Sequence, residues 1–420
     1  MKVLVVGSGG REHAIIWKLS KSKKVDKIYC APGNGGISEL AECINIPAIE
    51  VTKIADWAKE NEIDLTVIGM DDSLILGIVD RFEERGLRVF GPRQNAAILE
   101  GSKVFAKDLM KKYNIPTAGY EVFEDAGVAK KYLKECDYPV VLKADGLALG
   151  KGVLICHCVE EALDGVDEIM VDKKFGAAGS KMVVEEFMTG PEVSVLTFCD
   201  GEHLIPMVSA QDHKRAFDND QGLNTGGMGT FSPSKFYTED LSQQCYEELF
   251  LPSLKAMKLE GRPFTGIIFF GLMLTPNGPK LLEYNARFGD PEAQVVLTRL
   301  KTDLIDVFNA AIDGRLNELT LEWEDNSTVC VVLASGGYPL AYEKGYEITG
   351  LDQQKNKEDI IIFHAGTALK EGKYVTNGGR VLGVTAKGKD MNEAREKAYK
   401  AVSEIDFLYK QYRTDIGIKR

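Results

Sequence analysis

The stretch Met1-Lys-Val-Leu-Val-Val-Gly-Ser-Gly-Gly-Arg-Glu-His13 decides the fold of the first part of the chain. An apolar run that ends in a glycine turn and continues into a helix predicts a fully buried β-strand. Three further strands are predicted at 27–31, 64–69 and 87–90, and helical stretches separate them. Alternating strands and helices are typical of a parallel sheet, so residues 1–102 are predicted to form a doubly wound α/β domain.

Two more domains are expected after the first. Residues 103–325 combine strands, helices and two hairpins with turns at Asp200-Gly201 and Pro276-Asn277-Gly278, and a strand–loop–strand segment at about 120–188 is expected to form a small mobile lid. Residues 326–420 contain strands and one helix and predict a mixed α/β domain. The chain is therefore predicted to be a multidomain protein of α/β and α+β type. Between its regular parts, residues 211–235 are polar, glycine-rich and aperiodic, which indicates a long functional loop.

The composition limits the partners that the protein can have. The chain has 420 residues, with 51 Lys and Arg against 63 Asp and Glu, so its net charge is −12. An acidic surface repels a phosphate backbone, so no nucleic-acid partner is expected. The most apolar stretch, Gly266–Leu274, is about half as long as a membrane span, and the N-terminal run is too short for a signal peptide. A cytoplasmic protein without a membrane partner is therefore expected.

The first candidate site is the glycine turn Gly7-Ser-Gly-Gly10 after the first strand. Backbone amides of such a turn and of the following helix N-terminus attract anions. As a dinucleotide fingerprint the turn fails, because Glu12 stands where the third glycine of G-x-G-x-x-G belongs. Binding of a phosphorylated small molecule is the preferred interpretation, while packing alone and a nicotinamide or flavin cofactor remain open.

A second glycine-rich stretch, Lys143-Ala-Asp-Gly-Leu-Ala-Leu-Gly-Lys-Gly152, joins two predicted strands. It differs from a P-loop, because its glycines are too closely spaced and Gly152 replaces the Ser or Thr that would hold magnesium. A mobile glycine flap that closes over a triphosphate, with Lys143 and Lys151 beside it, fits this pattern better. An ordinary turn is the alternative.

The most specific stretch is Glu283-Tyr-Asn-Ala-Arg-Phe-Gly-Asp-Pro-Glu-Ala-Gln294. Strand alternation puts the oxygen-bearing side chains of Glu283 and Asn285 on one face, which suits Mg²⁺ that also keeps water and phosphate ligands. Arg287 supplies a planar fork that suits a carboxylate or a phosphate, and two acidic residues follow it. We therefore expect this stretch to bind a divalent cation and an anionic substrate.

The long loop contains two polar motifs, Gln211-Asp-His-Lys-Arg215 and Asn224-Thr-Gly-Gly-Met-Gly229. Polar side chains and flexible backbone amides suit closure around a polar, anionic substrate, and a solvated surface loop is the alternative. The sequence contains no motif typical of a Ser/His/Asp or Cys/His nucleophile and no paired-histidine metal motif. Chemistry that depends on an enzyme nucleophile is therefore not indicated.

Taken in order, these motifs resemble those of the glycinamide ribonucleotide synthetase family, which are ATP-grasp enzymes of purine biosynthesis. The resemblance spans essentially the whole chain. It implies a pre-ATP-grasp domain at 1–102, an ATP-grasp core with its lid at 103–325 and a C-terminal domain at 326–420. The stretches that carry it are Gly7–His13, Ala31–Asn34, Leu99–Lys103, Lys143–Val153, Ser209–Lys214, Asn224–Gly229, Glu283–Gln294, Ser335–Pro339, His364–Thr367 and Val375–Arg380.

The resemblance also implies a reaction. ATP, glycine and 5-phosphoribosylamine would give ADP, phosphate and glycinamide ribonucleotide through a glycyl phosphate intermediate, with Mg²⁺ or Mn²⁺ as the metal ion. Such chemistry needs cations around a transferring phosphoryl group rather than an enzyme nucleophile. A monomer is expected. The alternatives are another purine-pathway ATP-grasp ligase or carboxylase, which would use bicarbonate, and a nicotinamide-dependent oxidoreductase.

Functional residues of the family can be transferred to the matching positions of this sequence. Those implied in binding ATP are Lys103, Lys143, Gly150, Lys151, Gly152, Glu185, Glu186, Phe187, Met188 and Glu192. Those implied in binding the substrates are Gly9, Gly10, Arg11, Asn224, Thr225, Gly226 and Asp290. The implied metal ligands are Glu283 and Asn285. The residues implied in catalysis are Arg287, Asp212 and Lys214, with Asp212 as the proton acceptor.

One loop departs from the family pattern. The stretch Gly69-Met-Asp-Asp-Ser-Leu74 stands where the family usually has Gly-Pro-Glu-x-Pro-Leu, so the acid is the shorter Asp71. In addition, Gly266–Leu274 lacks the second metal carboxylate that many ATP-grasp relatives carry at this point. ATP and water are therefore expected to complete the metal shell.

Overall fold

The N-terminal part of the chain folds around a five-stranded parallel sheet of order β3-β2-β1-β4-β5, which confirms the prediction. The structure, a computed structural model, describes residues 1–147 and 152–418. Side chains of β1 alternate: Val3 and Val5 join the core that contains α1, and Leu4 and Val6 join the core that contains α2 and α4. The strands are β1 (Lys2–Gly7), β2 (Lys27–Pro32), β3 (Glu42–Cys43), β4 (Leu65–Ile68) and β5 (Val89–Phe90). The helices are α1 (Gly10–Leu19), α2 (Val51–Glu60), α3 (Asp71–Ile75), α4 (Ile78–Glu83) and α5 (Gln94–Gly101).

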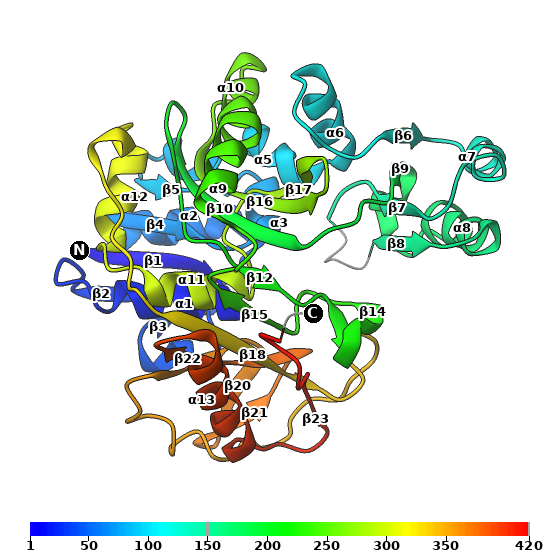
Figure 1. The fold of residues 1–420 in the computed structure, drawn as a ribbon. Helices are drawn as coiled ribbons and strands as arrows, with labels where there is room; N and C mark the ends of the chain where they lie inside the picture. The colour runs from blue at the N-terminus through cyan, green and yellow to red at the C-terminus, as the bar shows by residue number, and fades with distance from the viewer. Residues whose placement is uncertain (148–151, 419–420) are drawn as a thin grey trace.

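The segment expected to be a lid forms a small sheet of its own, which projects to one side of the molecule (Figure 1). Its strands have the order β6-β9-β7-β8 and pair antiparallel. They are β6 (Tyr120–Phe123), β7 (Val140–Ala144), β8 (Val153–Cys156) and β9 (Met182–Glu186). The neighbouring helices are α6 (Lys103–Lys112), α7 (Ala126–Leu133) and α8 (Val159–Val166).

A four-stranded antiparallel sheet of order β11-β10-β16-β17 follows in the chain. Both hairpins that the sequence predicts in this part are present, with turns after Asp200 and after Thr275. The strands are β10 (Glu192–Asp200), β11 (Leu204–Pro206), β16 (Thr265–Thr275) and β17 (Gly278–Asn285). The helices are α9 (Glu239–Cys245), α10 (Leu251–Leu259), α11 (Glu292–Arg299) and α12 (Leu304–Ile312).

The C-terminal sheet takes strands from two distant parts of the chain. Its order is β12-β15-β18-β22-β19, with β23 also paired to β18, so the sheet crosses the domain boundary expected at residue 326. Its strands are β12 (Gln211–Asp212), β15 (Gly229–Ser232), β18 (Ser327–Ser335), β19 (Ile360–His364), β22 (Arg380–Gly388) and β23 (Lys410–Gln411), and α13 (Met391–Glu404) packs on it. Two separate hairpins are β13 (Arg215–Phe217) with β14 (Gln221–Asn224) and β20 (Thr367–Lys370) with β21 (Lys373–Thr376).

The expectation of an irregular loop at 211–235 is therefore wrong. This stretch contains four short strands, and all four residues of β15 are buried. The backbone groups of β15 pair with β18, whose residues lie far along the chain. A local sequence pattern therefore does not predict this strand. Within the described part of the chain, no helix is long and apolar enough to cross a membrane.

Helix α11 lies where the sheets meet. Each of its residues is buried, and it packs against α1 of the N-terminal part and against β15 and β18 of the C-terminal sheet. The glycine turn before α1, the end of β17 and the loops around β12 and β14 consequently face one another (Figure 1). These segments carry most of the residues that the sequence marks for function.

Candidate active site

A cleft of about 1060 Å³ opens between the lid, the antiparallel sheet, the glycine turn and the C-terminal sheet. It is lined by every described residue to which a role was assigned except Gly10. A β-carbon on Gly10 would stand 2.6 Å from Nε2 of Gln294, so Gly10 permits close packing of α1 instead. Gly150 and Lys151 lie outside the described residues. Residues that are far apart in the sequence are thus gathered in one place.

Two buried lysines share one carboxylate on the lid side of the cleft. Nζ of Lys143 lies 2.9 Å from Oε1 of Glu185, and Nζ of Lys107 lies 2.9 Å from Oε2 of the same residue. Burial lowers the pKa of Lys107 to about 8, although Glu185 opposes this. Lys103 reaches the glycine loop, because its Nζ donates to the carbonyl of Gly146 at 2.8 Å. Apolar side chains, including Val141, Ile155, Met273 and Leu282, line the same end of the cleft.

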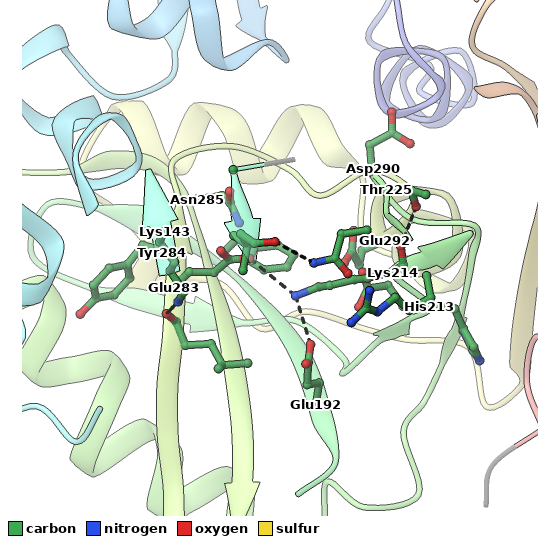
Figure 2. A pocket seen from close by; sticks show the side chains of 18 of the residues that line it. Lys143, Glu192, His213, Lys214, Thr225, Glu283, Tyr284, Asn285, Asp290 and Glu292 are labelled. Carbon is green, nitrogen blue, oxygen red and sulfur yellow. Dashed lines mark hydrogen bonds and ion pairs between the residues drawn. The ribbon is translucent and has the colours of Figure 1, made fainter. Parts of the chain in front are cut away.

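A second charged cluster stands at the centre of the cleft, as Figure 2 shows. Nζ of Lys214 lies 3.1 Å from Glu192 and 3.7 Å from Glu283. Burial alone would raise the pKa of Glu283, but the charges of Lys214, Lys143 and Lys103 outweigh it and lower that pKa. Burial, together with the nearby carboxylates, raises the pKa of Asp212 to about 7 in spite of Lys214. Asp212 is therefore an acid that can exchange a proton near neutral pH.

The end of β17 offers oxygen ligands for a divalent cation. Glu283 and Asn285 are separated by one residue on this strand and both line the cleft (Figure 2). Across the described residues, no group of three carboxylate, imidazole or thiol side chains could hold a metal ion by itself. Two protein oxygens next to three lysines fit Mg²⁺ that is shared with phosphate oxygens and water.

Arg287 is held by several acceptors at once. Its Nη2 lies 2.8 Å from Oε1 of Glu100, 3.4 Å from Asp71 and 3.3 Å from the side-chain oxygen of Asn285. Its Nη1 donates to the carbonyl of Phe288 at 3.2 Å. The Nε atom is buried and has no hydrogen-bond partner among the described residues. The guanidinium is therefore fixed in place by the protein, with one N–H group left over.

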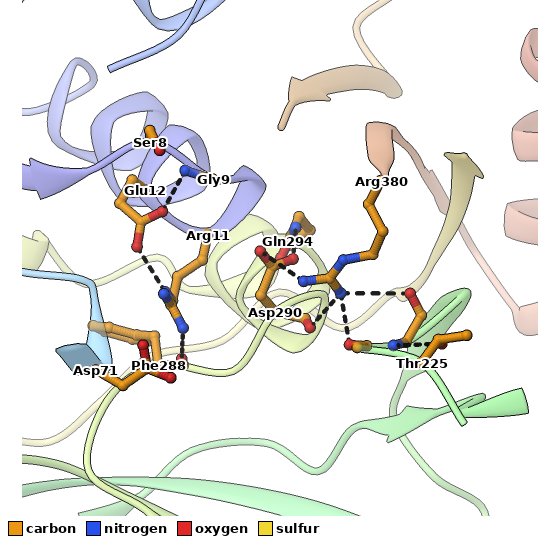
Figure 3. Close-up of polar contacts among 12 residues, drawn as sticks. Ser8, Gly9, Arg11, Glu12, Asp71, Thr225, Phe288, Asp290, Gln294 and Arg380 are labelled. Carbon is orange, nitrogen blue, oxygen red and sulfur yellow. Dashed lines mark hydrogen bonds and ion pairs between the residues drawn. The ribbon is translucent and has the colours of Figure 1, made fainter. Parts of the chain in front are cut away.

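The side chain of Glu12, in the first turn of α1, folds back onto the glycine turn that precedes this helix. The amide of Gly9 donates to Oε2 of Glu12 at 2.6 Å, and Nε of Arg11 donates to Oε1 of Glu12 at 2.7 Å (Figure 3). A β-carbon on Gly7 would stand 2.5 Å from the Glu12 side chain. Glu12 thus occupies the helix N-terminus where a dinucleotide fold binds pyrophosphate, which argues against the nicotinamide alternative.

Arg380 joins the C-terminal sheet to the substrate side of the cleft. Its Nη1 donates to the carbonyls of Gly226 at 2.6 Å and Asp290 at 2.7 Å, and its Nη2 lies 3.3 Å from the Asp290 carboxylate (Figure 3). On the other side, the amide of Gly226 donates to the hydroxyl of Tyr338 at 3.1 Å. Arg380 consequently fixes two segments to which the sequence assigns substrate binding.

Three further residues line the cleft although the sequence predicted no role for them: Glu100, Lys107 and Arg380. Glu100 and Arg380 stand inside motifs that carry the family resemblance, so those motifs are the signal that would have led to them. Lys107 follows Lys103 by one helical turn on α6, which places both lysines on the same face of that helix.

Comparison with known proteins gives a consistent result over the whole chain. Three domain models of phosphoribosylglycinamide synthetase match: the N domain at residues 1–100, the ATP-grasp (A) domain at 101–293 and the C domain at 328–419. The phosphoribosylamine–glycine ligase of Halalkalibacterium halodurans is 50% identical over 100% of this chain and 97% of its own length. The enzyme of the same name from Caldanaerobacter subterraneus is 49% identical over 99% of each chain.

Solved structures agree with these matches. The crystal structure of phosphoribosylamine–glycine ligase from Thermotoga maritima superposes with a TM-score of 0.87 at 36% identity and covers 99% of this chain and 100% of that one. A biotin carboxylase domain from Hydrogenobacter thermophilus reaches a TM-score of 0.74 at 18% identity, over 98% of this chain and 91% of its own. At that identity the second likeness concerns the fold alone.

Proposed function

This chain belongs to the phosphoribosylglycinamide synthetase family and ligates glycine to phosphoribosylamine in purine biosynthesis, and we propose that the reaction takes place in the cleft described above. The observation that carries the proposal is the arrangement of Lys103, Lys143, Lys214 and Arg287 around Glu283. Four cations beside a metal-ligating carboxylate suit transfer of a phosphoryl group. The carboxylase alternative is not favoured by the comparisons.

ATP is proposed to bind between the lid and β17. Lys103 and Lys143 would neutralise phosphate oxygens, and Gly152, which lines the cleft, would be part of the cover over them. The apolar side chains at the lid end form a pocket of the kind that accepts a purine base, beside the segment Glu185–Met188. Glu192 would hold the ribose hydroxyls. Because Glu185 already binds two lysines, its main proposed effect is to position Lys143.

Glu283 and Asn285 are the residues that would hold Mg²⁺ or Mn²⁺. When bound, the ion would offset charge on the phosphate oxygens during transfer. The lowered pKa of Glu283 supports this assignment, because the residue is ionised and able to act as a ligand at neutral pH. No further step depends on the identity of the metal.

The ligation itself is proposed to proceed in two steps. A carboxylate oxygen of glycine attacks the γ-phosphorus of ATP, the bond to the bridging oxygen breaks, and ADP leaves. The amine of 5-phosphoribosylamine then attacks the carbonyl carbon of the glycyl phosphate, and inorganic phosphate leaves as the amide bond forms. The amine gives up one proton in this step. Asp212, whose pKa is about 7, is the proposed acceptor.

Arg287 is proposed to orient glycine and the acyl phosphate. The buried Nε, which has no partner among the described residues, supports a contact with a substrate anion. Lys214 lies close enough to Glu283 to act on the same phosphoryl group. Reactants that are held in line by fixed cations need no enzyme nucleophile.

The phosphoribosyl group is proposed to bind beside the glycine turn and not at the helix N-terminus itself, which Glu12 occupies. Gly9, Arg11 and Asp290 face the cleft on one side, and Asn224, Thr225 and Gly226 face it on the other. Asp71, the acid in the loop that departs from the family pattern, lies 3.4 Å from Arg287. All of these residues come from one chain, which is compatible with activity as a monomer.

The test is phosphate release from ATP with Mg²⁺, glycine and freshly prepared phosphoribosylamine, with each reactant omitted in turn. We expect release that requires both glycine and phosphoribosylamine, together with a product of the mass of glycinamide ribonucleotide. Phosphate release that depends on bicarbonate and not on glycine would instead establish the carboxylase alternative.

A further inference from the structure

The chain returns to the rim of the cleft close to its C-terminal end (Figure 1). We call residues 413–415 the C-terminal strap and residues 215–224, which contain β13 and β14, the cleft hairpin. Arg413 and Asp415 of the strap line the cleft together with Asn219 and Asp220 at the tip of the hairpin. None of these four residues has a role in the function proposed above.

Arg413 is the centre of the contact between the strap and the hairpin. Its side chain is only 1% exposed. Nε and Nη2 bind the two oxygens of Asp415 at 2.7 and 2.8 Å, which is the bidentate geometry of a strong pair. Nη1 donates to the carboxylate of Asp220 at 2.9 Å and to the carbonyl of Arg215 at 3.1 Å. One guanidinium therefore binds the strap, the tip of the hairpin and its first strand.

Further bonds tie the strap to the hairpin tip. The amide of Thr414 donates to Oδ1 of Asp218 at 2.7 Å, and its hydroxyl donates to the other oxygen of that carboxylate. The amide of Asn219 donates to Oδ2 of Asp415 at 2.9 Å. Asn219 and Asp220 have φ angles of 59° and 55°, a left-handed backbone conformation that Asn and Asp adopt more readily than other residues with a side chain. The bonds from the strap thus stabilise the conformation of the hairpin tip.

The strap is itself fixed to the C-terminal helix. The hydroxyl of Tyr399 donates to the carbonyl of Arg413 at 2.8 Å, and Nη2 of Arg395 donates to the carbonyl of Thr414 at 2.7 Å. Both side chains come from α13, which packs on the C-terminal sheet. The strap therefore has a rigid support on one side and the hairpin on the other.

The base of the hairpin holds Lys214. Both the amide and the hydroxyl of Thr225 donate to the carbonyl of Lys214 at 2.8 Å. From that backbone position the Lys214 side chain reaches Glu192 and Glu283 in the cleft. At the same end, Nδ2 of Asn224 donates to the carbonyl of Val153 in β8 at 3.4 Å. A displacement of the hairpin would thus be passed to Lys214 and to a strand of the lid.

We propose that Arg413 and the C-terminal strap are positioning elements for catalysis, which keep Lys214 between Glu192 and Glu283 by fixing the cleft hairpin. Arg413 acts through the hairpin and does not touch the reacting atoms. This inference rests on the function proposed for the cleft. It assigns to the end of the chain an effect on turnover that is separate from its contribution to folding.

The test changes the exposed Thr414, the half-buried Asp218 and the buried Arg413, so that loss of the contact is measured at positions of different burial. Asp218→Ala, Thr414→Val and the double variant remove the side-chain bond between hairpin and strap, and Arg413→Met removes the central pair. Lys397→Met is the matched control, because it breaks an ion pair of 2.7 Å between α13 and Asp359 that does not touch the hairpin. Steady-state kinetics of the full chain and hydrogen exchange of peptides that cover 211–228 are measured in parallel.

We expect kcat to fall roughly tenfold in Arg413→Met and severalfold in the single variants, within the range that misplacement of a catalytic group produces. KM for ATP should change less than kcat. Amides of the hairpin should exchange faster, while α13 and β18 keep their protection. The double variant should be no worse than the more severe single variant, because both substitutions remove the same contact. Thr414→Ser, which keeps the hydroxyl, should restore kcat.

The inference would be overturned by strap variants with the kcat of the active parent chain, by a lower kcat with unchanged exchange in the hairpin, or by equal losses in Lys397→Met. Faster exchange throughout α13 and β18 would show a general destabilisation and would also overturn it. If the parent chain releases no glycine-dependent phosphate, the proposed function fails instead. The two failures are thus distinguishable.

Discussion

The carboxylate of Glu100 lies 2.8 Å from Nη2 of Arg287 and receives the amide of Ala286 on its other oxygen at 2.7 Å. Glu100 lies at the end of α5, in the N-terminal part of the chain. It therefore binds two residues that directly follow β17, Ala286 through its backbone amide and Arg287 through its side chain. Both partners of the ion pair are largely buried. Arg287 consequently keeps its orientation without help from a ligand, which is a form of preorganisation.

Arg287→Lys should lower kcat at least about a hundredfold, the loss typical of removing a donor that is aimed at developing charge. An ammonium group cannot reproduce the planar contacts to Glu100 and Asp71 or the buried N–H group. The dissociation constant for ATP should stay within about threefold of the parent value, since Lys103 and Lys143 are intact. Phosphate release and ATP titration check both numbers. Arg315→Lys, on the surface, serves as control, and near-normal turnover of Arg287→Lys would contradict its proposed role.

Glu100→Gln should change how stability depends on pH. Burial raises the pKa of Glu100 to about 7, although the charge of Arg287 opposes this. Between its ordinary pKa near 4.5 and pH 7, the folded chain holds a proton that the unfolded chain has lost, so the free energy of unfolding falls as pH rises through this window. Removal of this group should reduce the slope by up to about 1.4 kcal/mol per pH unit. Urea denaturation from pH 5 to 8 measures it, and an unchanged slope would count against the assignment.

Lys107→Met should destabilise the fold by about 3 kcal/mol, because Glu185 would be left buried with one lysine instead of two. The remaining lysine, Lys143, would be drawn toward Glu185, so KM for ATP should rise severalfold. Thermal denaturation and ATP kinetics give the two values. Lys111→Met, one turn further on α6 and exposed, is the control and should alter neither of them.

Gly36→Ala tests the contact between the N-terminal part and the C-terminal sheet. A β-carbon at this position would stand 2.1 Å from the ring of His364, a buried residue whose backbone amide donates to Nδ1 of His13 at 2.8 Å. The expected loss of stability is about 1–3 kcal/mol, as for an overpacked core. Gly119→Ala is the control, because it makes the same substitution at a site where the nearest atom to the new β-carbon is 3.7 Å away. The midpoint of unfolding of this variant should barely differ from that of the parent chain. Equal midpoints for the two variants would be evidence against tight packing at Gly36.

Glu283→Gln should raise the Mg²⁺ concentration needed for half-maximal activity by at least about tenfold, since a neutral amide is a poorer ligand for a hard cation. Lys214 would also lose one of its two carboxylate partners. Activity is measured against Mg²⁺ concentration at saturating ATP. If the Mg²⁺ concentration for half-maximal activity is unchanged in this variant, Glu283 is not a metal ligand.

The parts of the fold that the sequence predicts are those with local signals. The apolar run before Gly7 indicates β1, and Pro276-Asn-Gly278 marks the turn between β16 and β17. A helix is also predicted at 391–405, where the structure has α13, and the side chain of Asp390 caps its N-terminus. In each case the residues that decide the structure are neighbours in the chain.

The parts that escape prediction depend on distant partners. Strand β15 forms by pairing with β18, which lies far away in the sequence. A role for Glu100 can be inferred only from its contact with Arg287, which the sequence does not show. Residues from the motif Glu283–Gln294 line the cleft, yet a motif does not reveal that Arg287 is already held by four acceptors or that Gly10 faces Gln294. Roles for the residues in the cleft remain predictions for the experiments above.

The C-terminal sheet also has a consequence for how the protein is made on the ribosome. Strand β15 leaves the exit tunnel long before β18, its partner, has been synthesised, and at about 5–20 residues per second the delay lasts several seconds or more. During that time the backbone groups of β15 that later pair with β18 lack this partner, and other chains or chaperones can meet this open strand edge. Completion of the cleft is therefore a late event in biosynthesis, and fragments that stop before residue 327 should be prone to aggregate.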